Sequence, residues 1–193
     1  MKSVAIYCGA SAGTNDLYRQ QADAMGQELA QRGLTLVYGG GRVGLMGAVA
    51  DSVLRHGGQA LGVIPDFLAS KELAHLGLTE LFVVQTMHER KLKMAELADG
   101  FVAMPGGFGT MEELFEVLTW GQLGLHQKPV AVLNVGGFYD HLLRALDHMA
   151  TEGLLRPENR RQLLQDEDPA ALLEKMRDYQ PPAVEKWLTP PTT

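Results

Sequence analysis

Residues 101–113 read FVAMPGGFGTMEE, a short apolar run that passes through three glycines into a segment with helical spacing. The pattern predicts a buried strand at Phe101–Met104, then a glycine turn, then a helix at Thr110–Leu123. A helix that starts directly after such a turn presents unpaired backbone N–H groups and the positive end of its dipole. This stretch therefore predicts an anion site, suited to phosphate.

The same alternation of apolar runs and amphipathic segments extends along the chain. We predict further strands at 4–8, 34–38, 60–64, 81–84 and 130–135, a weaker one at 162–165, and further helices at 16–31, 44–55, 86–98, 139–152 and 169–177. Continuously apolar strands between helices indicate a sheet covered on both faces. We expect an α/β fold, a Rossmann-like doubly wound parallel sheet of six to seven strands with helices on both faces.

The length of 193 residues is typical of one domain. We expect a single domain over residues 1–180 and an irregular, proline-containing tail over 181–193, with Trp187 and Leu188 as candidates for anchoring that tail to a surface.

The charge balance is acidic, with 17 Lys and Arg against 23 Asp and Glu, a net charge of -6. Such a chain lacks the positive field that holds nucleic acids or anionic membranes, and no apolar run approaches the length that spans a bilayer. The single cysteine, Cys8, forms no internal disulfide, and the histidines show no metal-ligand spacing. We expect a cytoplasmic protein without a metal.

A second glycine run, GGGRVGLMG at 39–47, follows the predicted second strand. Gly39, Gly41 and Gly44 match G-x-G-x-x-G, but a dinucleotide fold places this motif after its first strand. A nicotinamide-linked reductase is therefore disfavoured. Two interpretations remain open: Gly44 and Gly47 let a helix pack close to the sheet, or the backbone here approaches a ligand.

The segment TMHERKLKM at 86–94 opens the helix after the fourth strand. Thr86-x-x-Glu89 is a capping box, and Arg90, Lys91 and Lys93 place three cations within four residues. In the expected sheet order the first and fourth strands are neighbours at the switch point, so Arg90 would project into the ligand crevice. The alternative is a solvated, charged helix face.

Glu113 also has two interpretations. Thr110-x-x-Glu113 has capping-box spacing, which would fold the glutamate back onto its own helix start. The alternative is a catalytic carboxylate beside a bound phosphate. The turn lacks the lysine of a Walker loop, which favours a monophosphate over a triphosphate.

The motifs at 87–91 and 105–113, in this order, resemble the LOG ("lonely guy") family, cytokinin-activating phosphoribohydrolases often mislabelled as lysine decarboxylases. The resemblance covers about residues 1–155. It implies a nucleotide-binding enzyme that hydrolyses the N-glycosidic bond of an adenosine 5′-monophosphate, N6-prenylated or plain, to free base and ribose 5-phosphate. It also implies a homodimer, and no cofactor is expected.

Carried over to this chain, the resemblance makes Arg90 and Glu113 the catalytic pair. The residues expected to bind substrate or its phosphate are Ser11, Gly40, Gly41, Glu72, Lys91, Gly106, Gly107, Phe108, Gly109, Thr110, Met111, Glu112 and Thr119. Of these, Glu72 and Thr119 rest on spacing more than on a motif.

Two other functions remain as alternatives. A non-catalytic nucleotide-binding or carrier module could use the same glycine turns, although this chain has both the arginine and the glutamate. A pyridoxal phosphate decarboxylase needs a Schiff-base lysine among cofactor contacts, for which Lys71, Lys91, Lys93 and Lys128 are weak candidates.

Overall fold

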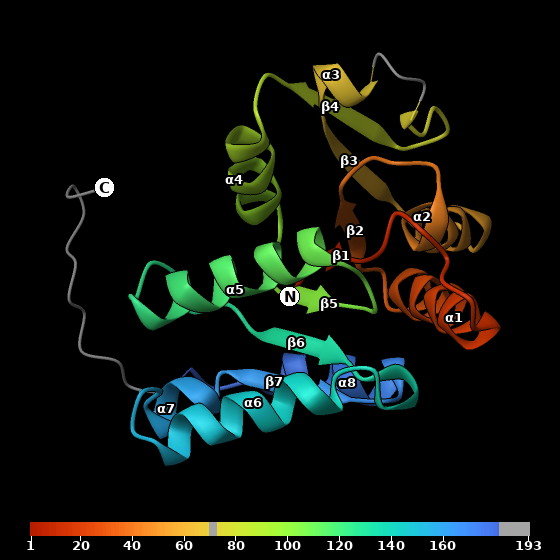
Figure 1. Ribbon diagram of the computed structural model, residues 1–193. Helices are drawn as coiled ribbons and strands as arrows, with labels where there is room; N and C mark the ends of the chain where they lie inside the picture. The colour runs from red at the N-terminus through yellow and green to blue at the C-terminus, as the bar shows by residue number, and fades with distance from the viewer. Residues whose placement is uncertain (70–72, 182–193) are drawn as a thin grey trace.

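One parallel sheet organises the chain, and the computed structural model describes residues 1–69 and 73–181. Within those ranges seven strands pair in the order β4-β3-β2-β1-β5-β6-β7 (Figure 1). The strands are β1 (Ser3–Tyr7), β2 (Thr35–Tyr38), β3 (Ala60–Pro65), β4 (Glu80–Val84), β5 (Phe101–Ala103), β6 (Val130–Leu133) and β7 (Leu163–Asp166). All pairings are parallel. The expected fold class is confirmed, including the weak strand at 162–165.

Helices connect the strands and cover both faces of the sheet. They are α1 (Asp16–Gln31), α2 (Gly44–Arg55), α3 (Asp66–Leu68), α4 (Met87–Leu97), α5 (Phe108–Gln122), α6 (Asp140–Thr151), α7 (Pro157–Arg160) and α8 (Pro169–Arg177), with a short 3-10 turn, η2 (Val135–Gly137). The ends of α1, α2 and α8 coincide with the predicted ones. Among the described residues, no helix combines the length and apolarity needed to span a membrane.

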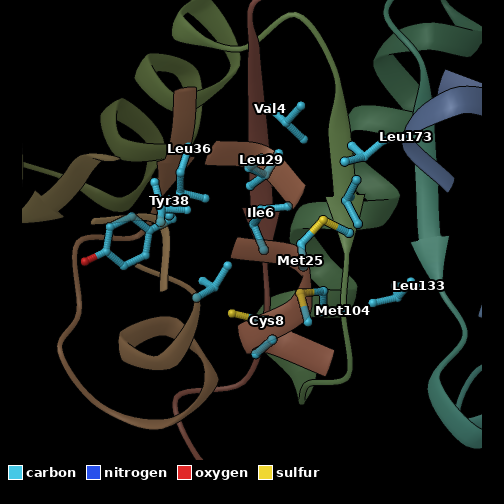
Figure 2. Close-up of a cluster of buried hydrophobic side chains, with 14 of the residues drawn as sticks. Val4, Ile6, Cys8, Met25, Leu29, Leu36, Tyr38, Met104, Leu133 and Leu173 are labelled. Carbon is cyan, nitrogen blue, oxygen red and sulfur yellow. The ribbon is translucent and has the colours of Figure 1, made fainter. Parts of the chain in front are cut away.

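The alternating side chains of β1 build two separate cores. Val4, Ile6 and Cys8 pack with side chains of α1 and β2 on one face (Figure 2). Ala5 and Tyr7 face the opposite core, which α4, α5 and α6 cover. Because both faces are buried, the central strand is apolar at every position, as a doubly wound sheet requires.

The strand order places the switch point between β1 and β5. The chain winds outward from β1 through β2 and β3 to β4, and α4 then returns it to the other side of β1. The prediction that the first and fourth strands are neighbours was wrong, because β2, β3 and β4 each add to the preceding strand and leave β4 at the edge. The turns after β1 and β5 meet instead, with the Gly9 N–H donating to the Pro105 carbonyl oxygen at 3.0 Å.

The starts of α4 and α5 differ in how they are closed. Thr86 caps α4 as predicted, its hydroxyl accepting from the Glu89 N–H at 3.1 Å. Of the two interpretations of Glu113, the capping box at Thr110 is wrong, because α5 begins at Phe108, with Gly107 as an N-cap that has no side-chain cap bond. Extended backbone at Gly107 starts the helix earlier, so Thr110 lies inside its first turn and Glu113 does not fold back to cap it.

Candidate active site

A cavity of about 400 Å³ opens at the carboxyl ends of β1 and β5. It lies at the switch point of the sheet, where doubly wound folds bind ligands, and its volume suits a small molecule. Apolar side chains make up most of the wall, and the polar side chains that line it include Arg90, Thr110, Glu112 and Glu113. These four come from α4 and α5, the helices on either side of β5 in the sequence.

Two helices start at the cavity without a side-chain cap. Asn15, Thr86 and Asp168 cap α1, α4 and α8, but the starts of α2 and α5 have no such bond. A Cβ placed at Gly107 or Gly109 would meet no atom within 4 Å, so the backbone there is open. Unpaired N–H groups at an open helix start can hold an anion.

The glycines at the start of α2 serve packing. A Cβ at Gly44, where φ is +63°, would overlap the backbone of Ala10, and a Cβ at Gly47 would overlap that of Arg42. The close approach lets the Leu45 N–H donate to the Gly9 carbonyl oxygen at 3.0 Å. Of the two interpretations of this run, close packing of α2 fits Gly44, although against the turn after β1, whereas the close approach at Gly47 is to Arg42 in the loop before α2.

Arg90 reaches the cavity from the first turn of α4. Its Nε donates to the Val63 carbonyl oxygen of β3 at 3.2 Å, and its guanidinium fills the place that a Cβ at Gly39 would occupy. Its Nη1 lies 3.4 Å from Oε1 of Glu113. Arg90 thus lies in the crevice, although it crosses the ends of β2 and β3 and does not come from a neighbour of β1.

Glu113 lies inside α5 with 8% of its surface exposed. Burial raises the pKa of its carboxyl group to about 7, with Arg90 and Lys91 opposing the rise and Glu112 and Glu116 adding to it. The carboxyl group therefore titrates much closer to neutral pH than an ordinary glutamate does. Such a poised acid in a cleft, beside a cation, is typical of catalytic groups.

Lys91 is not among the residues that line the cavity. It is 7% exposed, and its ammonium group binds the carboxylates of Glu112 and, at 2.9 Å, Glu116. Burial tends to lower the pKa of Lys91, but the two hydrogen bonds outweigh it and the pKa is raised. Glu112 itself lines the cavity and is more than half exposed.

The remaining residues of the glycine turn divide into buried and exposed positions. Thr110 is buried, and its hydroxyl fills the place of a Cβ at Gly106. Met111 packs partly buried against the core under α4 and α5. Phe108, at the first position of α5, is 96% exposed.

Two candidates in the second glycine run, Gly40 and Gly41, contact the segment that contains Ala74 and His75. Gly40 has φ +73°, and its carbonyl oxygen accepts from the His75 N–H at 2.9 Å. Gly41 lines the cavity and pairs with Ala74 in an isolated bridge.

Two candidates lie away from the cavity lining, and a third falls outside the described residues. Ser11 is exposed, and its hydroxyl accepts from the Gly13 N–H at 3.2 Å. Thr119 donates to the Phe115 carbonyl oxygen at 2.7 Å and lines a different hollow, between α5 and the segment around α7. Glu72 is outside the described residues.

Known proteins match this chain over most of its length. The family described as "Possible lysine decarboxylase" matches residues 46–176. A cytokinin riboside 5′-monophosphate phosphoribohydrolase of Rhodococcoides fascians is 52% identical over 164 residues, which are 84% of this chain and 83% of that protein. The Arabidopsis thaliana enzyme of the same name, LOG5, is 44% identical over 93% of this chain and 79% of its own. The chain belongs to the LOG family. The resemblance drawn from the two motifs is confirmed.

Solved structures add a likeness in fold to this LOG protein. The molybdenum cofactor binding protein from Rippkaea orientalis superposes with a TM-score of 0.70 at 19% identity, covering 91% of this chain and 95% of its own. The Moco carrier protein from Chlamydomonas reinhardtii gives 0.68 at 20% identity, with the same two coverages. At these identities the comparison shows a common fold alone.

The LOG cavity offers no described lysine for a Schiff base, despite the family's description. Lys91 is bound by two carboxylates, and the Lys128 ammonium donates to the Ala95 carbonyl oxygen at 2.7 Å. The lysines among residues 1–69 and 73–181 are absent from the cavity lining, and Lys71 is outside the described residues. Within residues 1–69 and 73–181, no lysine is therefore placed in the cavity to hold such a cofactor.

Sequence reasoning missed two residues of this LOG site. Gly39 appeared only as part of a weak glycine pattern, yet it makes room for Arg90. Tyr7 lines the cavity, and burial, with the Glu113 charge adding, raises the pKa of its hydroxyl well above the usual range. The alternation of side chains along β1 predicts which face of the sheet Tyr7 lies on. It identifies Tyr7 as a site residue only once α5 is known to cover that face.

Proposed function

We propose that this protein hydrolyses the N-glycosidic bond of adenosine 5′-monophosphates, N6-prenylated or plain, to the free base and ribose 5-phosphate. The observation that supports this most is the Arg90–Glu113 pair, 3.4 Å apart in a cavity beside two uncapped helix starts. The names of the relatives add independent support.

Glu113 is the proposed general base. Glycosidic cleavage builds positive charge on the ribose, and a carboxylate beside C1′ stabilises that charge. Glu113 takes a proton from the attacking water as the C1′–O bond forms and the C1′–N9 bond breaks. The base leaves with the bonding electron pair and takes a proton from solvent water, and Glu113 releases its proton to solvent to restore the carboxylate. A base is most effective with a pKa near the working pH, and the pKa of Glu113 is about 7.

Arg90 is the proposed partner of both Glu113 and the substrate. Its positive charge favours the ionised carboxyl group of Glu113, and its remaining N–H groups are available to ribose hydroxyls or phosphate oxygens. The planar guanidinium is held by the Val63 carbonyl oxygen, so its orientation is fixed before substrate binds.

The glycine turn is the proposed phosphate site. We assign the phosphate to Gly106–Thr110 at the start of α5, with Met111 and Glu112 adjoining. Gly41 of the second glycine turn lines the same cavity and is proposed as a neighbour of the phosphate. Holding the phosphate places C1′ against Glu113, so binding energy far from the bond contributes to the rate.

The apolar wall is the proposed seat of the base. Val43, Met46, Leu68 and Leu73 line the cavity between the second glycine turn and α3. A side-chain wall of this kind fits an adenine ring and a prenyl group on N6.

We expect a cytoplasmic homodimer. Leu92 of α4 and Phe108 and Phe115 of α5 are exposed apolar side chains on adjacent helices, a feature of interfaces between chains. Cys8 is a free thiol, which a reducing compartment preserves.

The test is a base-release assay with AMP, N6-prenylated AMP and the two corresponding nucleosides, using Glu113→Gln as the inactive control. We expect release from both monophosphates and little from the nucleosides. Equal release from nucleosides would remove the phosphate-anchor role. Binding of AMP without release of adenine would identify a carrier instead.

A further inference from the structure

Lys91 combines deep burial with partners on a neighbouring helix. The side chain of Lys91 is 8% exposed. Both of its ion-pair partners, Glu112 and Glu116, belong to α5. The two carboxylates are one helical turn apart, so a single cation holds one face of α5. A buried ammonium group with two carboxylate partners is fully compensated and remains charged.

Lys91 with Glu112 and Glu116, which we call the clamp, is adjacent to the proposed catalytic pair. Arg90 precedes Lys91 directly, and Glu113 follows Glu112 directly. The side chains of Arg90 and Glu113 face the cavity, whereas Lys91 is not among its lining residues. The Arg90–Glu113 pair and the two Lys91 pairs therefore join the same two helices. The first lies in the cavity, and Lys91 and Glu116 lie behind the lining residue Glu112.

We propose that Lys91 is a positioning residue that holds α5 against α4 through Glu112 and Glu116 and so fixes Glu113 beside Arg90. The inference rests on the proposed function for its catalytic meaning. It differs from the role that the resemblance implies, in which Lys91 contacts the substrate.

The charges around Glu113 give the clamp a second effect. The charged groups that act on its carboxyl group are Arg90 and Lys91 of α4 and Glu112 and Glu116 of α5. Two further titratable groups face it, Tyr7 at the end of β1 and the adjacent Cys8, and the Glu113 charge helps to raise the pKa of each. Tyr7 and Cys8 remain neutral near pH 7, because burial raises the pKa of each. Lys91 thus balances two carboxylates that would otherwise act on Glu113 without compensation.

The experiment follows the titration of the Glu113 carboxyl carbon by NMR, assigned with Glu113→Gln. In Lys91→Met we expect the pKa of Glu113 to rise by roughly half a unit or more, because two neighbouring carboxylates lose their cation. In Glu116→Gln we expect it to fall, and in Lys91→Arg to remain near the parent value. Lys93→Met is the matched control, because Lys93 lies over the Phe82 ring and 4.0 Å from Glu96, away from α5.

Two further readouts accompany the titration. We expect Lys91→Met to lower kcat/KM about tenfold, as misplacement of a reacting group does, and to leave the Kd for ribose 5-phosphate nearly unchanged. An unaltered Glu113 titration in Lys91→Met and Glu116→Gln would overturn the proposal, and so would a large loss of ribose 5-phosphate affinity with no change in titration. If Lys91→Met does not fold, kcat/KM of Glu116→Gln decides: a loss with an unchanged Kd for ribose 5-phosphate supports the clamp, and an unchanged kcat/KM overturns it.

The titration separates this proposal from the proposed function. Absence of base release from the parent protein would refute the hydrolase, while the response of Glu113 to Lys91 would still be measured. The reverse outcome, base release with a Glu113 titration that ignores Lys91, would refute the clamp alone.

Discussion

The guanidinium group of Arg90 occupies the space that any side chain at position 39 would need. Gly39 directly follows β2, and Arg90 crosses it to reach Glu113 from α4. The two residues are 51 positions apart, yet neither can be changed without regard to the other. A side chain at position 39 would clash with the Arg90 guanidinium group. We therefore expect it to impair the proposed reaction more than the fold.

Gly39→Ala should therefore displace Arg90. We expect kcat/KM for base release to fall by roughly ten- to a hundredfold, because the misplaced guanidinium no longer aligns with Glu113. Gly100→Ala is the control, since its new methyl group meets Met1 Sδ, Met176 Cε and the Pro129 ring, none of which lines the cavity. In an Arg90→Ala background the Gly39→Ala change should have little further effect, and additive losses would contradict the steric explanation.

Arg90→Ala should lower kcat/KM by about a hundredfold or more, because positioning and charge are lost together. Arg90→Lys should recover little of it, since an ammonium group cannot bond the Val63 carbonyl oxygen and face Glu113 with the same planar geometry. Steady-state kinetics with AMP measure both variants. An unchanged kcat/KM in Arg90→Ala would place the residue outside the mechanism.

The pH dependence of kcat/KM should show an acid limb near pH 7. Glu113 acts in its ionised form, and burial raises its pKa to about 7, so the rate falls as pH drops through that value. Arg90 lowers the pKa of Glu113, so residual activity in Arg90→Lys should retain the limb. A limb at the usual glutamate pKa would mean that a different carboxylate, or none, is the base.

Glu113 should also make the folded protein less stable at alkaline pH. Its folded pKa of about 7 exceeds the value of 4.5 of an ordinary glutamate, so the stabilising effect of the protonated form is complete below pH 4.5 and is lost as pH rises through 7. The ceiling is about 3 kcal/mol, at about 1.4 kcal/mol per pKa unit. Denaturation at pH 5 and pH 9 should show a smaller pH dependence in Glu113→Gln than in the parent, while Glu80→Gln, at an exposed position, should match the parent.

Local features were predictable from the sequence. The limits of α1, α2 and α8 followed from apolar spacing and end signals, and Thr86 was recognisable as a cap. Each of these depends on residues within a few positions. The position of β4 did not, because strand order depends on which edge of a growing sheet is free, and periodicity does not encode that.

The site was predictable in composition but not in arrangement. Arg90 and Glu113 were identifiable from their motifs, and the structure brings them to one cavity. Spacing suggested Thr110 as a cap and left the start of α5 two residues late, because extended backbone at Gly107 leaves no side-chain signal. The partners of Lys91 were hidden as well, since a contact between two helices appears only after packing.

The cavity is lined at the start of α5 by backbone N–H groups and at the apolar wall by side chains. One end is main chain, whose donors are the same whatever residues the genetic code places there, and only a change in backbone shape can alter it. The other end is made of interchangeable side chains such as Met46 and Leu73. In the proposed assignment, substitutions in the apolar wall can therefore change the preferred base while the backbone groups that bind the phosphate stay the same.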